Sequence, residues 1–189
     1  RLGYEPKTLV KGGVLVELGG EGRPLCYGAH YDTIAAVVRS IKPNGHLKVT
    51  PVGGLHANSV EGENVTVYTR FNGSYEGTFQ PETGSAHVNV NADAPRSFET
   101  ITEVVLDEMV KTSEDVRNLG IMHGDFVVLD PRFTITSKGY IKSRFIDDKA
   151  AVAIQLALAK AVKEGEVKLA RKVYLIFTDY EEIGHGGSA

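Results

Sequence analysis

The sequence predicts an α/β protein whose α/β domain is interrupted by a β-rich, barrel-like insertion. Two observations support this fold class. The apolar strand-like segments near the start and the helix-then-strand pattern near the end are similar in kind, whereas the middle consists of short strands and turns. We therefore expect one α/β domain built from residues 1–36 and 137–189, with the insertion at residues 37–136.

Composition places the chain among folded globular proteins and excludes two classes of function. Hydrophobic residues make up 42% and charged residues 24% of its 189 residues, which is close to the average for soluble domains and sufficient for a core. No apolar stretch approaches the roughly 20 residues that cross a bilayer, so membrane insertion is excluded. The net charge is −3, and the absence of a long basic cluster argues against a nucleic-acid partner.

The single cysteine, Cys26, restricts the chain's redox chemistry. One cysteine cannot form an intrachain disulfide or a cysteine-rich zinc finger, and this usage fits a reducing compartment. We therefore expect a cytoplasmic protein. Because Cys26 lies in an apolar segment, it is also expected to be a buried strand residue.

The α/β segments are predicted from four apolar runs. Val14–Val16 and Leu25–Tyr27, bounded by glycines and a proline, are typical of short strands. Lys149–Lys163 is rich in Ala, Val, Ile and Leu and predicts a buried helix. Val173–Phe177 is a continuous apolar run, as in central parallel strands covered on both faces. The helix and this strand together predict an α/β crossover.

Two Asn-Gly turns organise the insertion. Asn44-Gly45 separates Val37–Ile41 from His46–Val52, and this pattern predicts a β-hairpin. Asn72-Gly73 separates two further strand-like runs, Val65–Phe71 and Ser74–Phe79, and predicts a second hairpin. Further along, a short helix is expected to begin at Ser113 and end at Gly120, and Phe126–Leu129 is expected to be a strand.

His30 and Asp32 follow the second predicted strand. Residues two apart in an extended segment point the same way, so one can bind a metal while the other orients it. The alternative is a strand-end histidine beside an unrelated turn aspartate.

Asp147 and Asp148 stand where the predicted helix begins. One of them is expected to cap the helix, because carboxylates accept hydrogen bonds from the free amides at a helix N-terminus. The functional alternative is a carboxylate that bridges two divalent cations.

Glu181 and Glu182 come soon after the last predicted strand. Adjacent like charges are unfavourable unless something positive lies beside them, and a metal ion meets that need. One carboxylate can then bind metal while the other moves a proton. The alternative is the acidic first turn of a surface helix. Taken together, His-x-Asp, Asp-Asp and Glu-Glu form a nitrogen and oxygen donor set without thiolate, which suits Zn²⁺, Co²⁺ or Mn²⁺.

The ordered motifs resemble those of the TET-type metallo-aminopeptidases, the glutamyl and deblocking aminopeptidase family whose members often bear an endoglucanase label. The resemblance covers nearly the whole chain. The segments that resemble family motifs are Gly28–Ile34 (A-H-M-D-E-I-G in the family), Asn44–Gly54 (G-x-L-x-x-x-x-x-G-G), Asn118–Asp125 (L-G-V-x-x-G-D), Asp147–Lys149 (D-D/N-R) and Thr178–Gly184 (T-x-x-E-E-V-G).

The resemblance implies a zinc-peptidase-like catalytic domain with two divalent metal ions, Zn²⁺ or Co²⁺ or else Mn²⁺. It implies His30, Glu182 and a bridging Asp147 as metal ligands, Glu181 as general base, and Asp32 as the residue that orients His30. Substrates would be peptides with a free N-terminus. The β-rich insertion would serve assembly into dimers and then a dodecamer.

Some features depart from the family pattern. Thr33 and Ala35 replace the family's Glu and Gly, and Lys149 replaces its Arg. The chain also lacks an initial Met and stops in a Gly-rich turn, so we expect it to be truncated at both ends. The resemblance implies that two further metal ligands, an Asp and a His, lie beyond the Glu-Glu motif and outside this sequence, so we expect an incomplete metal site and little activity alone. Two alternatives remain open: a related zinc exopeptidase or amidohydrolase, and a non-catalytic assembly module.

Overall fold

The computed structural model describes residues 2–85, 87–100 and 102–187. The chain divides into two compact units, one formed by Arg1–Thr33 with Phe145–Ala189 and the other by Ile34–Arg144. The first is an α/β unit and the second contains a closed six-stranded antiparallel barrel, so the predicted fold class is confirmed. The domain boundaries expected at residues 37 and 137 stay a prediction. Each unit is described by itself.

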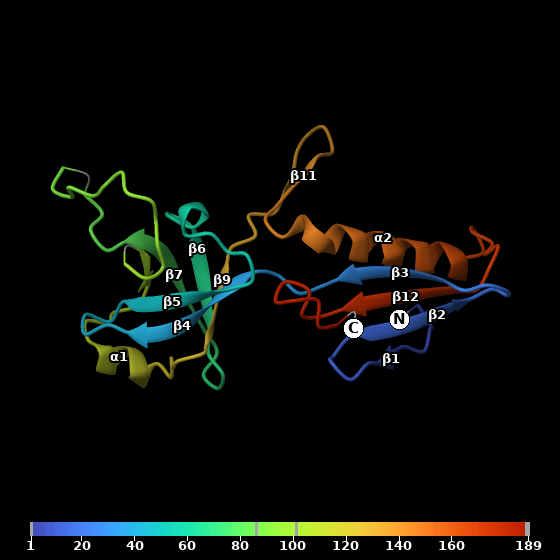
Figure 1. Cartoon of the computed structure of the whole chain (residues 1–189), viewed down its shortest axis with the longest axis horizontal. Helices are drawn as coiled ribbons and strands as arrows, with labels where there is room; N and C mark the ends of the chain where they lie inside the picture. The colour runs from blue at the N-terminus through green and yellow to red at the C-terminus, as the bar shows by residue number, and fades with distance from the viewer. Residues whose placement is uncertain (1, 86, 101, 188–189) are drawn as a thin grey trace. The chain divides into compact units, whose positions relative to one another are not determined.

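A mixed four-stranded sheet forms the α/β unit, with strand order β1-β2-β12-β3 (Figure 1). Its strands are β1 (Lys7–Thr8), β2 (Val14–Gly19), β3 (Leu25–His30) and β12 (Val173–Thr178). β12 is the central strand: it pairs antiparallel with β2 and parallel with β3, in a register that places Thr178 opposite His30. The carboxyl ends of β3 and β12 therefore meet at one edge of the sheet.

Helix α2 (Ile146–Lys163) lies along one face of this sheet (Figure 1). Ala159 of the helix packs in a cluster with Leu18, Val173 and Leu175 of the strands. The hydroxyl of Tyr4 donates a hydrogen bond to the carbonyl of Ala159, 3.0 Å away. The helix precedes β12 in the chain, so the predicted α/β crossover is confirmed.

Three burial expectations for this unit are wrong for the described residues. The expected buried helix buries only Gln155 and Ala159 and leaves Ile154 70% exposed, because the sheet covers one side of it. β12 is not fully covered on both faces, since three of its residues are buried and the other three are half-buried. Cys26 is exposed, although it lies in the predicted strand.

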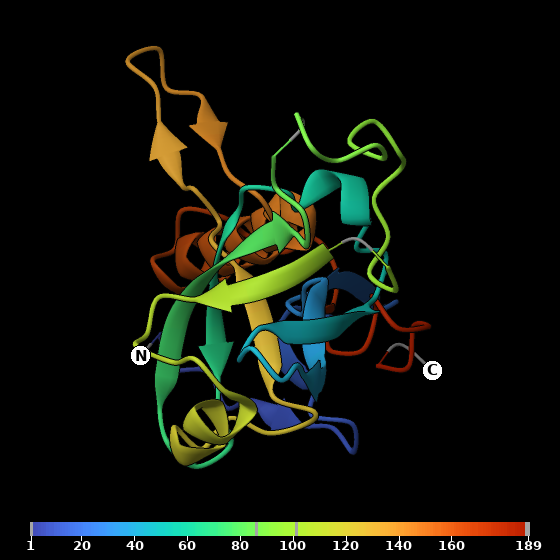
Figure 2. The same ribbon diagram turned by 90° about the vertical axis from the view of Figure 1, so that its left-hand side faces the viewer.

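The second unit is a barrel with strand order β4-β5-β8-β7-β6-β9 (Figure 2). Its strands are β4 (Ala35–Ile41), β5 (Leu47–Val52), β6 (Asn64–Tyr68), β7 (Ser74–Pro81), β8 (Thr102–Leu106) and β9 (Phe126–Leu129). β4 pairs with β5 and β6 with β7, so both predicted hairpins are confirmed. Their turns depend on Gly45 and Gly73, which adopt φ of +83° and +84°, a conformation that costs glycine little.

Apolar side chains from alternate strand positions fill the barrel. Phe79 and Leu47 are fully buried, and the ring of Phe79 meets that of Phe98 edge to face at 6.1 Å between centroids. Two charged strand residues, Lys48 and Glu103, are also buried. Glu103 accepts hydrogen bonds from Lys42 at 2.6 Å and pairs with the His46 ring at 2.7 Å, so its charge is compensated.

Smaller elements complete the second unit. Helix α1 (Ser113–Asn118) begins with a capping box in which Thr112 and Asp115 exchange hydrogen bonds, and Gly120 follows it, as expected. The remaining elements are the 3₁₀ turn η1 (Ala57–Ser59) and the hairpin strands β10 (Thr134–Ile135) and β11 (Ile141–Lys142). In neither unit does a described helix have the length and apolarity to cross a membrane.

Candidate active site

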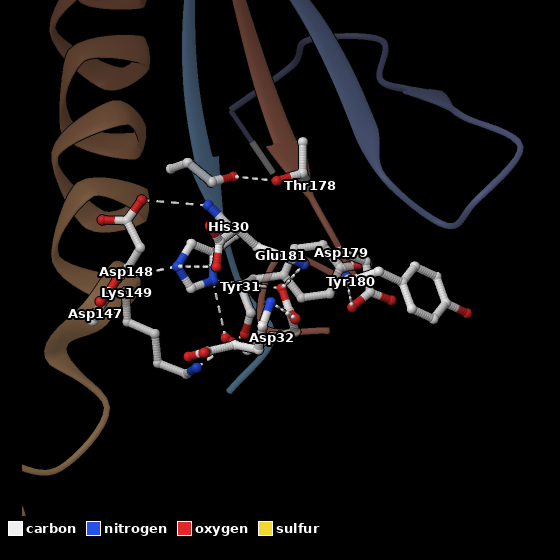
Figure 3. A network of polar contacts seen from close by, with 12 residues as sticks. His30, Tyr31, Asp32, Asp147, Asp148, Lys149, Thr178, Asp179, Tyr180 and Glu181 are labelled. Atoms are coloured by element: carbon white, nitrogen blue, oxygen red, sulfur yellow. Dashed lines mark hydrogen bonds and ion pairs between the residues drawn. The ribbon is translucent and has the colours of Figure 1, made fainter. Parts of the chain in front are cut away.

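The polar edge of the α/β sheet brings together segments far apart in the sequence (Figure 3). His30 ends β3, Asp32 follows it, and Glu181 and Glu182 lie in a turn soon after β12. Asp147 approaches from the start of α2. The parallel β3–β12 pairing places the first two segments side by side, because both strands end at the same edge.

His30 is the buried centre of this cluster, with 8% of its surface exposed. Its Nε2 atom lies 3.1 Å from Oδ1 of Asp147 and 3.9 Å from Oε2 of Glu181. Its Nδ1 atom faces Asp32, 3.2 Å from the main-chain carbonyl oxygen and 3.4 Å from the carboxylate. Burial acts to lower the pKa of His30, but the bond to Asp147 and the neighbouring carboxylates outweigh it and raise the pKa.

The backbone is irregular where α2 begins. Asp147 and Asp148 are joined by a cis peptide bond and have non-helical φ/ψ, and Phe145 before them is left-handed at φ +61°. No side-chain cap bond forms at the helix's N-cap residue, Phe145. The only described hydrogen bonds of the two carboxylates run to His30: Asp147 meets its ring and Asp148 accepts from its amide, 3.3 Å away. The expectation that one of them caps the helix is therefore wrong.

Asp32 joins the end of β3 to the Glu181–Glu182 turn. Its carboxylate accepts hydrogen bonds from the backbone amides of Glu181, at 3.3 Å, and Glu182, at 3.1 Å. The turn is tight, since Tyr180 adopts a φ of +65° and Gly187 returns so close to Asp179 that a Cβ there would lie 2.0 Å from its carbonyl oxygen. No described residue from 179 to 187 is helical, so the surface-helix alternative for the glutamates is wrong.

Glu182 and Lys149 have opposite charges in the same cluster. Burial raises the pKa of Glu182, and the carboxylates of Asp147, Glu181 and Asp32 add to that rise against the opposing effect of His30. Burial lowers the pKa of Lys149, although Asp32 and Glu182 act to raise it. The Nζ atom of Lys149 donates a hydrogen bond to the main-chain carbonyl of Tyr31, 2.9 Å away.

Three contacts of this site were not predicted from the sequence. They are the bond of Asp148 to the His30 amide, the bond of Lys149 to Tyr31, and a contact of 2.7 Å between Nδ1 of His185 and Oε1 of Glu181. His185 lies four residues after Glu181, and residues at this spacing can meet within a single turn. This spacing was the sequence signal that could have predicted the His185–Glu181 contact. The other two contacts join residues 118 positions apart, and no local pattern predicts them.

The chemistry of the donors fits a divalent cation in part. One imidazole nitrogen and several carboxylates, with no thiolate, form the set that Zn²⁺, Co²⁺ and Mn²⁺ accept. His30 Nε2 and Asp147 Oδ1 face one another, as two ligands of one ion would. Among the described residues, however, no group of three or more His, Cys, Asp or Glu side chains is arranged to hold a metal. The described residues thus offer donor atoms of suitable chemistry but no complete group of metal ligands.

Comparisons with a family model and with a curated relative both point to aminopeptidases. A family model described as M42 glutamyl aminopeptidase matches residues 12–189. The protein YhfE of Bacillus subtilis is 39% identical over 181 residues, which cover 95% of this chain and 52% of YhfE. The chain thus spans about half the length of this curated relative.

Solved structures show the same relationship. A TET aminopeptidase from a marine Thaumarchaeota archaeon superposes with a TM-score of 0.86 at 20% identity, over 97% of this chain and 51% of its own. The TET1 peptidase of Pyrococcus horikoshii, which can assemble into a tetrahedron or a large octahedral shell, has a TM-score of 0.79 at 26% identity, over 98% of this chain and 54% of its own. The first of these likenesses concerns the fold alone.

Proposed function

Because the chain belongs to the M42 glutamyl aminopeptidase family, we propose that it forms part of a binuclear-metal aminopeptidase that removes residues one at a time from the free N-terminus of peptides. The observation that supports this most is the contact of His30 with Asp147 beside two glutamates that Asp32 holds by their amides. In this proposal His30, Asp147 and Glu182 would hold the metal ions, and Asp147 would serve as a ligand common to both.

Two divalent cations at this site would supply Lewis-acid polarisation of the scissile carbonyl and a more acidic water. Glu181 is the general base in this proposal. Its carboxylate takes a proton from the attacking water and returns it to the leaving amine. Asp32 supports both steps, because it faces Nδ1 of His30 and fixes the backbone of Glu181 and Glu182.

We propose further that the protein acts in the cytoplasm as a homo-oligomer. The P. horikoshii relative can assemble into a tetrahedron or a large octahedral shell, and the barrel unit is the part of this chain that we assign to assembly. Peptides are the expected substrates.

A second candidate, a non-catalytic assembly module, is favoured by one observation. The described residues hold no complete group of metal ligands. The two candidates differ in what they require of the α/β unit: the peptidase needs the donors at its polar edge, whereas the module needs only the barrel.

The test is peptide hydrolysis with defined metals. The polypeptide as its gene encodes it is freed of metal, reloaded with Zn²⁺ or Co²⁺, and incubated with a peptide that has a free N-terminus and with its N-acetylated form. We expect metal-dependent release of single N-terminal residues from the free peptide alone. A discrete oligomer that shows no hydrolysis with any of the metals would support the assembly module instead.

A further inference from the structure

The backbone at the end of β3 is held by two consecutive residues of α2. Asp148 Oδ2 accepts a hydrogen bond from the amide of His30, 3.3 Å away, and Lys149 Nζ donates one to the carbonyl of Tyr31, 2.9 Å away. Figure 3 shows both side chains reaching from the helix to the strand. Asp148 therefore binds the backbone amide of His30, and Lys149 binds the backbone carbonyl of the next residue, Tyr31.

The amide of His30 needs such a partner because β3 is the edge strand of the described sheet. The carbonyl of Tyr31 lies beyond the last residue of β3, where the ladder with β12 has ended. The amide of Tyr31 bonds to Thr178 of β12, at 3.1 Å. In a parallel ladder successive amides point to opposite sides, so the amide of His30 faces away from β12. Asp148 is the acceptor that meets it there.

Asp148 and Lys149 directly follow Asp147, whose contact with the His30 ring is central to the proposed function. The amide of His30 bonds to Asp148, and the side chain of the same His30 meets Asp147 at 3.1 Å. The start of α2 is not set by a cap bond at Phe145 or by regular helical geometry at Asp147 and Asp148. The described hydrogen bonds that join the start of α2 to the end of β3 are the bonds of Asp148 and Lys149 and the contact of Asp147 with the His30 ring.

We propose that Asp148 and Lys149 are positioning residues that hold the end of β3 against the start of α2 and thereby set the geometry of His30 and Asp147. The role of His30 and Asp147 as a metal-binding pair rests on the function proposed above. The two hydrogen bonds, from the His30 amide to Asp148 and from Lys149 to the Tyr31 carbonyl, are called the clamp. The clamp does not depend on metal, so it can be tested with and without metal.

The experiment compares two disruptive and two conservative variants of the polypeptide as its gene encodes it. Asp148→Ala removes the acceptor, whereas Asp148→Asn keeps a carbonyl oxygen that can accept from the His30 amide. Lys149→Met keeps the aliphatic stem but removes the donor, whereas Lys149→Arg keeps a donor. Lys168→Met, on an exposed position of the same unit, is the matched control.

The first readout is metal-free amide hydrogen exchange of His30, followed by NMR together with the shifts of its ring nitrogens. We expect Asp148→Ala to speed this exchange by at least about tenfold and both disruptive variants to shift the Nε2 resonance, while the conservative variants and the control resemble wild type. Unchanged exchange in Asp148→Ala and unchanged ring shifts in Lys149→Met would overturn the clamp. If Asp148→Ala does not fold, wild-type behaviour of Asp148→Asn together with a shifted ring in Lys149→Met supports the clamp.

The second readout is the affinity for Zn²⁺ alone, measured by calorimetry. Loss of residues that orient metal ligands costs about 10–100-fold in affinity, and we expect that loss in Asp148→Ala and Lys149→Met but not in their conservative partners. Equal zinc affinity in all variants would overturn the link between clamp and metal pair. If wild type binds no zinc while the exchange and ring-shift effects are present, the clamp stands and the proposed metal function fails.

Discussion

The carboxylate of Asp32 accepts a hydrogen bond from the backbone amide of Glu182, 3.1 Å away, across 150 residues of chain. Its other oxygen accepts from the amide of Glu181 at 3.3 Å. The side chain of Asp32, just after β3, therefore fixes the two glutamates beyond β12. The main-chain carbonyl and the carboxylate of Asp32 also face the ring of His30. The His-x-Asp and Glu-Glu motifs are joined through this residue.

Replacement of Asp32 by Asn is expected to loosen the glutamate turn. Asn offers one acceptor oxygen, and its amide NH₂ would face an N–H donor, so one of the two hydrogen bonds is lost. We expect faster amide exchange at Glu181 or Glu182 and a loss of zinc affinity of about 10–100-fold. Isothermal titration with Zn²⁺ and NMR exchange measure the two effects. Exposed Glu166→Gln serves as the control, and equal zinc affinity in both variants would contradict the expectation.

Replacement of Leu175 by Ala tests the core that supports the site. Leu175 is 1% exposed and packs with Leu18, Val173 and Ala159 beneath α2. Truncation of a buried leucine costs about 2–5 kcal/mol in the free energy of unfolding. Urea unfolding followed by NMR resonances of β12 measures this loss. Val167→Ala, at a more exposed position, is expected to change stability by less than about 0.5 kcal/mol, and a similar small effect at Leu175 would be evidence against this core.

The pH dependence of the barrel is expected to include Glu82. A hydrogen bond from Lys48 lowers the pKa of Glu82 below its model-compound value of 4.5, against the opposing effect of burial and with help from Lys42. Because the folded pKa lies below the unfolded one, the stabilisation is present above pH 4.5 and is lost as the pH falls through the folded pKa.

Glu82→Gln removes this titration. We expect the variant to be less stable than wild type at about pH 7, and we expect the difference to shrink as the pH falls toward about 3. Denaturant unfolding of the barrel resonances across this range provides the measurement. Glu108→Gln, on an exposed position of the same unit, should follow wild type at every pH, and a Glu82 variant that does the same would show that the pair is not stabilising.

Local patterns predicted many elements of both units, although β1, β8, β10, β11 and the turn η1 were not predicted. The Asn-Gly turns predicted the β4–β5 and β6–β7 hairpins because a left-handed glycine conformation determines such turns. Strand Phe126–Leu129 and the helix beginning at Ser113 followed from apolar and capping patterns. Burial was less predictable, because apolar content alone does not show which side of α2 other residues cover. For that reason Ile154 is exposed where a buried helix was expected.

Charged residues within strands show a second limit. Lys48 and Glu103 are buried in the barrel, where the alternation of apolar residues gives no sign of them. His46 belongs to the same network, because its ring lies 2.7 Å from Glu103. Such networks depend on which strands become neighbours around the barrel, and that arrangement is not a local property of the chain.

The site was predictable in composition and less so in its connections. His30, Asp147, Glu181 and Glu182 stand in one cluster at the polar sheet edge, as their positions after predicted strands or at a helix start suggested. The cross-links that organise them, from Asp32 to the glutamate amides and from Asp148 and Lys149 to β3, join segments separated by more than 100 residues. Their roles in catalysis stay predictions.

The measurement that tests the proposed peptidase most directly is the activity of Glu181→Gln in the polypeptide as its gene encodes it. Gln keeps the shape of Glu181 but cannot accept a proton from water, and a general base contributes about 10²–10⁴-fold. We expect kcat for N-terminal residue release to fall by that factor, with zinc content and affinity close to those of wild type and with Glu166→Gln fully active. Full activity of Glu181→Gln at unchanged metal content would contradict the assignment of Glu181 as the base.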